Sequence, residues 1–453
     1  MDAAKQIDVQ TLFDHLPLGT FQRLVLFAGF CLIGLDGFDL TCMGYVAPAL
    51  KAQWHLSNMA LGPVLSAALI GLAVGAFASG PIADRYGRKG VILACLLIFG
   101  SFTLAAAGAQ DVVQLTVLRF CAGLGMGALL PNAATLVAEF APRRHRSLAV
   151  SLAFCGLPAS SACGGFLAAW LIPNYGWQAV LLLGGALPLL LLPLFAWKLP
   201  ESPAYLATRG APRERIRAVL ARAVPSLGDA QAGFAVPEKP TGAARLVLSR
   251  RYLAGGVVLW VAYFATLFTL HLLVNWLPTL IKESGFSIAD AATVGALFQA
   301  GGLVGGLALG WSMDRVGLHK VLACAYVACA LVLIGLSRVT HVLPALEVQA
   351  FLLGCCLTGA TVAVNALPTI FYPTEARATG TSWMHSAGRW GAILSAFAGA
   401  QMLGWGWNAA MVFMALTVPA LCAGAALLLQ PVAARRRRIE AVPHGAGIAE
   451  ESL

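Results

Sequence analysis

Four ionisable side chains, Asp36, Asp39, Arg119 and Arg389, lie inside long apolar stretches of this 453-residue chain. A charged side chain at the centre of a lipid bilayer costs at least about 2.5–3.5 kcal/mol on insertion scales, so each of them needs a compensating reason. Carboxylates can bind and release protons, and a guanidinium can hold an anion. These four residues are therefore the first candidates for chemistry.

The two aspartates are three residues apart, so they share one face of a helix. Burial and a second carboxylate favour the protonated form of a carboxyl group, whereas a nearby guanidinium favours the charged form. We expect Asp36, Asp39 and Arg119 to lie at similar depth and to couple proton movement, with Asp39 carrying the proton and Asp36 or Arg119 tuning it. The alternative is a buried ion pair, such as Asp36 with Arg119, that only fixes packing.

Arg389 is the predicted anion-binding residue. A guanidinium keeps its charge and can bind a carboxylate through two parallel hydrogen bonds. The apolar run that contains Arg389 holds no acidic residue, so we expect its charge to be freer than that of Arg119. His385 lies one turn earlier and could relay a proton, although we favour the alternative of a hydrogen-bonded interior histidine.

The composition around these residues is that of a membrane protein with many helical spans. The chain is 59% hydrophobic and only 11% charged, against about 25% charged residues in soluble domains. This excludes a disordered chain and a soluble enzyme, and it argues against a nucleic-acid partner. We find no nucleotide-binding loop, metal-ligand set or nucleophile triad, so we expect neither enzyme activity nor a cofactor or metal. The 11 cysteines resemble small buried hydrophobic residues.

Twelve apolar runs are long enough to cross a bilayer as helices, which takes about 20 residues each. Their approximate ranges are 21–50, 60–82, 90–109, 113–139, 147–172, 177–198, 252–282, 289–314, 319–338, 344–370, 377–402 and 406–430. The sequence thus predicts an all-α membrane protein with two six-helix halves. The predicted division is an N-terminal half at 1–198, a cytoplasmic linker loop at 199–251 with a short helix near 212–223, a C-terminal half at 252–430, and a cytoplasmic tail at 431–453.

The positions of Lys and Arg predict the orientation, because membrane proteins concentrate these residues on the cytoplasmic side. With both termini in the cytoplasm, only Lys51, Lys282 and Arg338 of the 30 Lys and Arg residues fall on the outer side, and only Arg119 and Arg389 lie within spans. We expect a multi-pass protein with both ends in the cytoplasm, and a monomer by default.

A short motif occurs once in each predicted half. Gly80, Asp84, Arg85 and Gly87 match Gly310, Asp314, Arg315 and Gly317 at a constant offset. Parallel repeats of this kind place a substrate site near the midplane between the halves. Glycine allows a tight turn, and the aspartate can accept hydrogen bonds from a helix N-terminus or an arginine. We expect a conformational latch, fuller in the first copy, made of Gly80, Asp84, Arg85, Gly87, Arg88, Glu139, Asp314 and Arg315.

Several of these motifs resemble those of a known family. Gly80–Lys89 (GPIADRYGRK) resembles the signature between spans two and three of the major facilitator superfamily, Arg119–Gly127 resembles its Arg-and-glycine signature in span four, and Pro200–Pro203 resembles its motif after span six. Within that superfamily, Leu35–Asp39 (LDGFD) and the stretch leading into Gly388–Gly391 are similar to the aromatic acid:proton symporters. The resemblance covers essentially the whole chain.

This resemblance implies a twelve-helix transporter of the bacterial inner membrane. It would import an aromatic carboxylic acid of the benzoate, hydroxybenzoate or phenylpropionate class together with a proton, for aromatic catabolism, by alternating access. The alternative is a symporter of the same fold for a non-aromatic acid such as quinate, muconate or a sugar acid. The expected partners are thus an organic acid, a proton and the lipid bilayer. Candidate contacts for a planar acid beside Arg389 and His385 are Trp383, Tyr263, Phe298, Gln299 and Asn365.

Overall fold

The structure is a computed structural model that describes residues 6–8, 19–209, 211–223, 233–235, 243–365 and 367–440. Long helices make up nearly all of this part of the chain. Those before the central connection are α2 (Thr20–Trp54), α3 (Asn58–Tyr86), α4 (Arg88–Ala106), α5 (Val112–Phe140), α6 (Arg146–Phe154), α7 (Gly156–Tyr175) and α8 (Gln178–Lys198). Those after it are α12 (Leu253–Glu283), α13 (Ile288–Val316), α14 (Leu318–Arg338), α15 (Leu343–Val364), α16 (Leu367–Phe371), α17 (Thr374–Gly404) and α18 (Ala409–Glu440).

The connecting regions contain only short elements. They are the 3-10 turn η1 (Arg143–His145), the helices α9 (Pro203–Thr208), α10 (Arg213–Ala223) and α11 (Ala243–Val247), and two three-residue strands, β1 (Gln6–Asp8) and β2 (Gly233–Ala235), which pair in parallel. Helix α10 confirms the short helix predicted near 212–223. The strand pair has no counterpart in the sequence-based expectation, because three residues carry too little pattern to identify a strand.

The predicted all-α membrane fold is confirmed. Eleven helices within the described residues are long and apolar enough to cross a membrane. The remaining predicted span corresponds to α17, which is 31 residues long but carries Arg377, His385 and Arg389 on a background rich in Ser and Gly. Two predicted spans are each divided in the structure, one into α6 and α7 and the other into α15 and α16.

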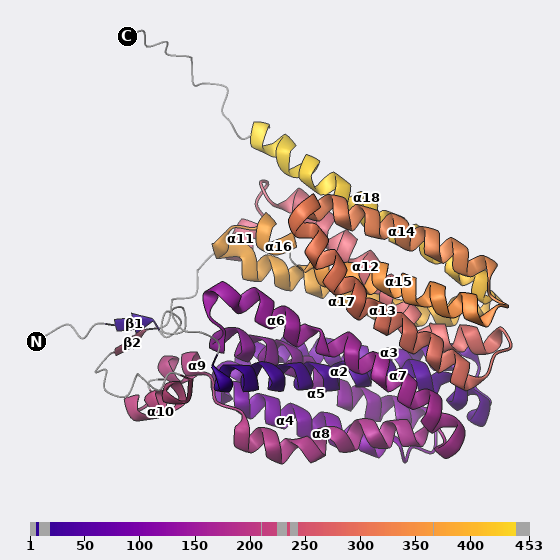
Figure 1. Ribbon diagram of the computed structural model, residues 1–453, viewed down its shortest axis with the longest axis horizontal. Helices are drawn as coiled ribbons and strands as arrows, with labels where there is room; N and C mark the ends of the chain where they lie inside the picture. Colours follow the sequence, from indigo (N-terminus) through magenta and orange to yellow (C-terminus); the bar gives the residue numbers. More distant parts are fainter. Residues whose placement is uncertain are drawn as a thin grey trace, which may run out of the picture.

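The helices form two bundles, one of α2–α8 and one of α12–α18 (Figure 1). In the first bundle α3 and α4 both pack on α5, and in the second α13 packs on α15. The bundles meet through α2 with α12, α7 with α13, and α3 with α17. These pairs place α2 and α17, the helices that carry the two aspartates and Arg389, on facing sides of the junction.

The closest contacts between the bundles lie at the end away from the N-terminus, which we call the closed end (Figure 1). A Cβ atom on Gly44 would lie 2.1 Å from the Val274 carbonyl oxygen, so only glycine lets α2 and α12 approach so closely. Lys51 forms an ion pair with Glu283 about two turns further along the same helices. This end of the junction therefore depends on the absence of a side chain at position 44.

A pair of matched substitutions tests the packing at the closed end. Gly44→Ala should lower the apparent Tm of the purified protein, because overpacking of a tight contact costs about 1–3 kcal/mol. Gly80→Ala is the control, since a Cβ atom there meets nothing within 4 Å and alanine favours helix over glycine. Thermal unfolding in detergent measures both. Equal Tm values for the two variants would contradict the close contact.

Candidate functional site

A fully buried ion pair joins α2 to α5. Arg119 and Asp39 each have 0% of their side chains exposed. Arg119 Nη1 donates a hydrogen bond to Asp39 Oδ1 at 2.8 Å, and Nη2 donates to Asp39 Oδ2. Both carboxylate oxygens are thus held by one guanidinium, an arrangement about twice as strong as neutral hydrogen bonds.

Neighbouring polar groups complete this pair. Thr103 on α4 donates to Asp39 Oδ1 at 3.2 Å, and its Oγ1 accepts from Arg119 Nη1 at 3.3 Å. The Cys42 thiol donates to the Asp39 carbonyl oxygen. From the sequence, the three charged residues were expected at similar depth, and Asp36 with Arg119 was the example given for a purely structural ion pair. The structure pairs Arg119 with Asp39 instead. Thr103 and Cys42 were missed, because short polar residues in an apolar run give no distinctive signal.

Asp36 has a different environment one turn earlier on α2. It is 2% exposed, and its Oδ1 has no hydrogen-bond partner among the described residues. Its charge interacts with those of Asp39 and of Arg389 on α17. Between the two aspartates, Gly37 lets α2 lie against Leu157 of α7, whose carbonyl oxygen a Cβ atom would approach to 2.4 Å. The Asp-Gly-Phe-Asp sequence thus directs one carboxylate to α5 and brings the other within reach of α17.

Arg389 is half-buried, and no ion pair or hydrogen bond to another described residue engages its guanidinium. The residue before it, Gly388, packs directly on the Tyr263 ring, and Gly391 packs on the backbone at Phe264, both on α12. Side chains at these glycines would force α17 away from α12. The glycines therefore fix the position from which the Arg389 guanidinium extends.

Of the other predicted contact residues, Tyr263 and His385 lie within range of the Arg389 charge, Asn365 lies beside Tyr263, and Trp383 packs on α12. Tyr263 is buried, and its hydroxyl lies 3.3 Å from Nδ1 of His385, with the two rings edge to face at 5.2 Å. Asn365 lies close to the same hydroxyl, and its buried Oδ1 has no partner in the part of the chain that the structure describes. Trp383 packs on Trp260 of α12 with ring centroids 5.6 Å apart. These groups supply aromatic surface and hydrogen-bonding atoms close to a free positive charge.

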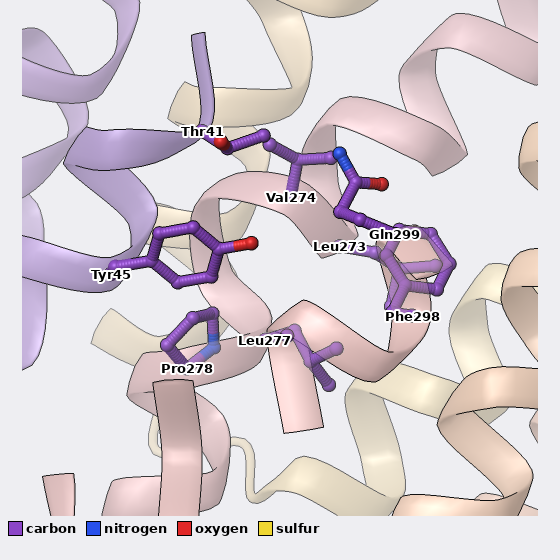
Figure 2. Close-up of a pocket in the computed structure, with 9 residues that line it drawn as sticks. Thr41, Tyr45, Leu273, Val274, Leu277, Pro278, Phe298 and Gln299 are labelled. Atoms are coloured by element: carbon purple, nitrogen blue, oxygen red, sulfur yellow. The ribbon is translucent and has the colours of Figure 1, made fainter. Parts of the chain in front are cut away.

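Phe298 and Gln299 lie in a different place. They line a small cavity between α2, α12 and α13, with Thr41 and Tyr45 on its other side (Figure 2). Tyr45 points from α2 toward this cavity, and the Gln299 Oε1 is buried without a partner among the described residues. The structure thus divides the predicted contact residues into an Arg389 group and a second group toward the closed end.

The first copy of the repeated motif belongs to a network at the opposite end of the molecule. Arg88 Nη1 lies 2.7 Å from Glu139 Oε1 and donates to the Ser202 hydroxyl at 2.5 Å, and that hydroxyl donates to Glu139 Oε2. The predicted link between Glu139 and this motif is therefore present, through Arg88.

Glu201 supports the same network. Its Oε1 accepts hydrogen bonds from the backbone N–H groups of Arg88 at 2.9 Å and Lys89 at 3.1 Å, which caps the N-terminus of α4. Gly87, at φ +86°, makes the turn that exposes those groups, and a Cβ atom there would lie 2.4 Å from the Glu201 carboxylate. From the sequence, Glu201 was recognised only as part of the Pro200–Pro203 motif. Its position two residues before α9 gives no sign of a cap on a distant helix.

The remaining motif residues are exposed or less constrained. Among the described residues outside its own stretch of helix, no atom lies within 4 Å of a Cβ position at Gly80, and the Arg85 carbonyl oxygen accepts from Tyr205 at 3.1 Å. Asp84 is exposed. In the second copy Arg315 stacks over Trp311 at 3.9 Å, whereas the Asp314 side chain lies outside the described residues. Among the described residues, no group of three or more His, Cys, Asp or Glu side chains could hold a metal ion.

Comparison with known proteins gives concordant matches. The sequence matches the model of the Major Facilitator Superfamily over residues 29–394 and 259–450. It is 45% identical to the 4-hydroxybenzoate transporter PcaK of Pseudomonas aeruginosa, covering 95% of this chain and 97% of that protein. It is 44% identical to a gallate transporter of Pseudomonas putida (93% and 94% covered) and 34% identical to the 3-(3-hydroxy-phenyl)propionate transporter of Escherichia coli (94% and 98% covered).

Solved structures match the fold at low sequence identity. The crystal structure of a D-xylose-proton symporter superposes with a TM-score of 0.69 at 17% identity, covering 90% of this chain and 97% of that one. An inward open structure of the xylose transporter XylE from E. coli gives a TM-score of 0.70 at 16% identity, covering 90% and 96%.

The energetic role of the buried pair can be tested by charge removal. Arg119→Ala leaves the Asp39 carboxylate buried and uncompensated, which should destabilise the protein by about 3–5 kcal/mol. The double variant Asp39→Asn/Arg119→Gln removes both charges and should recover most of the lost Tm. Lys51→Ala is the control, because an exposed pair contributes only about 0–1 kcal/mol. A double variant no more stable than Arg119→Ala would show that the two charges do not compensate each other.

Proposed function

We propose a cargo and a mechanism for this chain, which belongs to the Major Facilitator Superfamily and is a multi-pass membrane transporter rather than an enzyme. The proposed cargo is an aromatic carboxylic acid of the benzoate, hydroxybenzoate or phenylpropionate class, imported in symport with a proton. The names of the relatives support this choice, since each names an acid with an aromatic ring. They favour the aromatic cargo over quinate, muconate or a sugar acid.

The observation that carries the proposal is the unengaged guanidinium of Arg389. An organic acid that enters a low-dielectric cavity as an anion must exchange water for another source of positive charge, and an unpaired buried charge costs several kcal/mol. Arg119 is already held on both η nitrogens by Asp39. Arg389 has no such partner among the described residues, so it is the cation that a substrate carboxylate can reach.

The surroundings of Arg389 suit an aromatic acid. Aromatic rings pack well edge to face or offset-stacked, and such pairs contribute about 0.5–1.5 kcal/mol beyond their buried area. Tyr263 and Trp383 supply such rings from α12 and α17. His385 and Asn365 supply hydrogen-bonding atoms for ring hydroxyl groups. Phe298 and Gln299 lie toward the closed end, where they would cover the far side of a bound ring.

The proposed transport cycle alternates contact between the two ends of the halves, here residues 1–198 and 252–430 on either side of the 199–251 linker. The distribution of Lys and Arg supports an orientation with both termini and the 431–453 tail in the cytoplasm. In that orientation the closed end, with Gly44 and the Lys51–Glu283 pair, faces outward. Contact between the halves at that end is the arrangement from which a substrate at Arg389 would leave toward the cytoplasm. We propose that a monomer performs this cycle.

The network of Arg88, Glu139, Ser202 and Glu201 is the proposed latch at the cytoplasmic end. It ties the start of α4 to the end of α5 and to α9. Charged hydrogen bonds of this kind form in one arrangement and break in another, so they can bias an equilibrium between two conformations. Asp84, Arg85 and Arg315 are exposed in the present state, and with Asp314 they complete the proposed set.

Transport by purified protein in liposomes tests the proposed cargo and coupling. With the inside alkaline, the protein should concentrate 4-hydroxybenzoate or a related aromatic acid, and a protonophore should reduce the internal level to that outside. Quinate and muconate, tested under the same gradient, should not accumulate. Accumulation of the alicyclic acid alone would favour the non-aromatic cargo, and protonophore-insensitive accumulation would contradict proton symport.

Substitution of Arg389 tests the proposed carboxylate contact. Arg389→Ala should reduce the affinity of the purified protein for the transported acid by 100-fold or more, on the basis of about 3 kcal/mol for a charged contact that is lost. Arg389→Lys keeps the charge but loses the planar pair of donors, so its affinity should be intermediate. Arg338→Ala is the control, because Arg338 is exposed and belongs neither to the proposed site nor to the proposed latch. Unchanged affinity in Arg389→Ala would transfer the role to Arg119.

A further inference from the structure

The two aspartates of α2 differ sharply in what they contact. Asp39 is engaged by two guanidinium nitrogens and by Thr103, so its charged form is fully compensated. Asp36 is almost as deeply buried, yet its Oδ1 accepts no hydrogen bond from any described residue. A buried carboxylate without donors is costly, and a protonated carboxyl group at the same place is much less so. Protonation of Asp36 would therefore remove the cost of a buried charge that lacks hydrogen-bond donors.

Packing places Asp36 at the level of Arg389. Leu40 of α2 packs against a small apolar cluster that Leu69 of α3 forms with Ala392 and Ile393 of α17. Both helices run away from the N-terminal end of the molecule, so one turn back along each reaches Asp36 and Arg389 together. Consistently, the charges of Asp36 and Arg389 interact. The only opposite charge that reaches Asp36 from the other bundle is thus the proposed substrate-binding guanidinium, among the residues that the structure describes.

We propose that Asp36 carries the transported proton, and that its carboxylate and the substrate carboxylate neutralise Arg389 in turn. This inference rests on the proposed symport of an organic acid, and it deepens that proposal by assigning the proton. From the sequence alone, Asp39 was the expected carrier. Asp39 is the weaker choice because its protonation would leave the charge of the buried Arg119 without a counter-charge. Protonation of Asp36 instead leaves Arg389 available for an incoming anion.

The charges balance at each step. In the empty transporter, the Asp36 carboxylate offsets the Arg389 guanidinium. The acid enters as a carboxylate and pairs with Arg389, while Asp36 takes one proton from the same side and becomes a neutral carboxylic acid. After the halves rearrange, the substrate carboxylate leaves, Asp36 gives its proton to the other side, and its carboxylate again faces Arg389. One proton crosses with one monoanion, so no net charge moves.

Few other titratable groups face Asp36. Asp39 lies on its own helix and is paired with Arg119 of α5. Cys95 of α4 is buried and lies within range of the Asp36 charge. On α17 the facing group is Arg389, with His385 beyond it. The α7 residues against this part of α2, Gly156, Leu157 and Ser160, do not titrate. Among these groups Asp36 is the unpaired carboxylate.

Asp36→Asn tests the assignment, because asparagine imitates the protonated carboxyl group permanently. In liposomes the variant should lose accumulation driven by a pH gradient, yet exchange internal for external labelled acid at a rate within about threefold of wild type. The affinity of the wild-type protein for the acid should fall about tenfold per pH unit once Asp36 is charged in the empty protein, whereas the affinity of Asp36→Asn should stay constant over the same range. Asp36→Glu, the matched control, keeps a titratable group and should keep some concentrative uptake.

Three results would overturn the assignment. They are gradient-driven accumulation by Asp36→Asn, loss of both exchange and binding in folded Asp36→Asn, or retained exchange without accumulation in Asp39→Asn instead. If Asp36→Asn does not fold, Asp36→Ser replaces it with the same expectations. A membrane potential imposed without a pH gradient should drive no accumulation in wild type, and accumulation under that condition would also contradict the charge balance. Failure of wild type to concentrate any aromatic acid would instead overturn the proposed function.

Discussion

A guanidinium inside an apolar helix bundle must be balanced by an anion, and Arg119 and Arg389 meet that requirement in opposite ways. Arg119 is balanced internally and permanently by Asp39, with both η nitrogens engaged and the pair sealed from solvent. Arg389 is half-buried and faces a carboxylate on the other bundle that it does not bind. The first arrangement holds three helices of one half together. The second leaves a positive charge at the junction of the halves, where an anionic cargo can complete the balance.

The positions of these charges depend on glycines that let helices approach closely. Gly37 sets α2 against α7 between the two aspartates, and Gly388 and Gly391 set α17 against α12 on either side of Arg389. Gly44 plays the same part between the halves at the closed end. A transporter must exchange one set of contacts between halves for another, and contacts made by backbone rather than by interlocking side chains separate with little rearrangement. The glycines thus set the helix spacing that determines where the charged side chains lie.

The sequence contained most of the architecture but only part of the site. Apolar run length was sufficient to locate the helices, although α17 is the least apolar of them because Arg389 and its neighbours lie there. Counting residues along each predicted helix was sufficient to predict that the aspartates and Arg119 lie at similar depth. It could not tell which aspartate faces Arg119, since residues three apart differ in direction by an amount smaller than the uncertainty in helix rotation. Phe298 and Gln299 were expected to contact the substrate beside Arg389, but they face a cavity nearer the closed end. The cap that Glu201 forms on α4 joins residues more than 100 positions apart, so the sequence gives no reason to pair them.

The central claim is that the substrate carboxylate replaces the Asp36 carboxylate at Arg389, and the number of protons taken up on binding tests it most directly. Calorimetric titration of the purified protein with its aromatic acid, repeated in buffers of different ionisation enthalpy, gives that number without any mutation. At a pH where Asp36 is charged in the empty protein, the account predicts an uptake close to one proton for each acid bound. Binding of the acid with no proton uptake at any pH at which it binds would contradict the account.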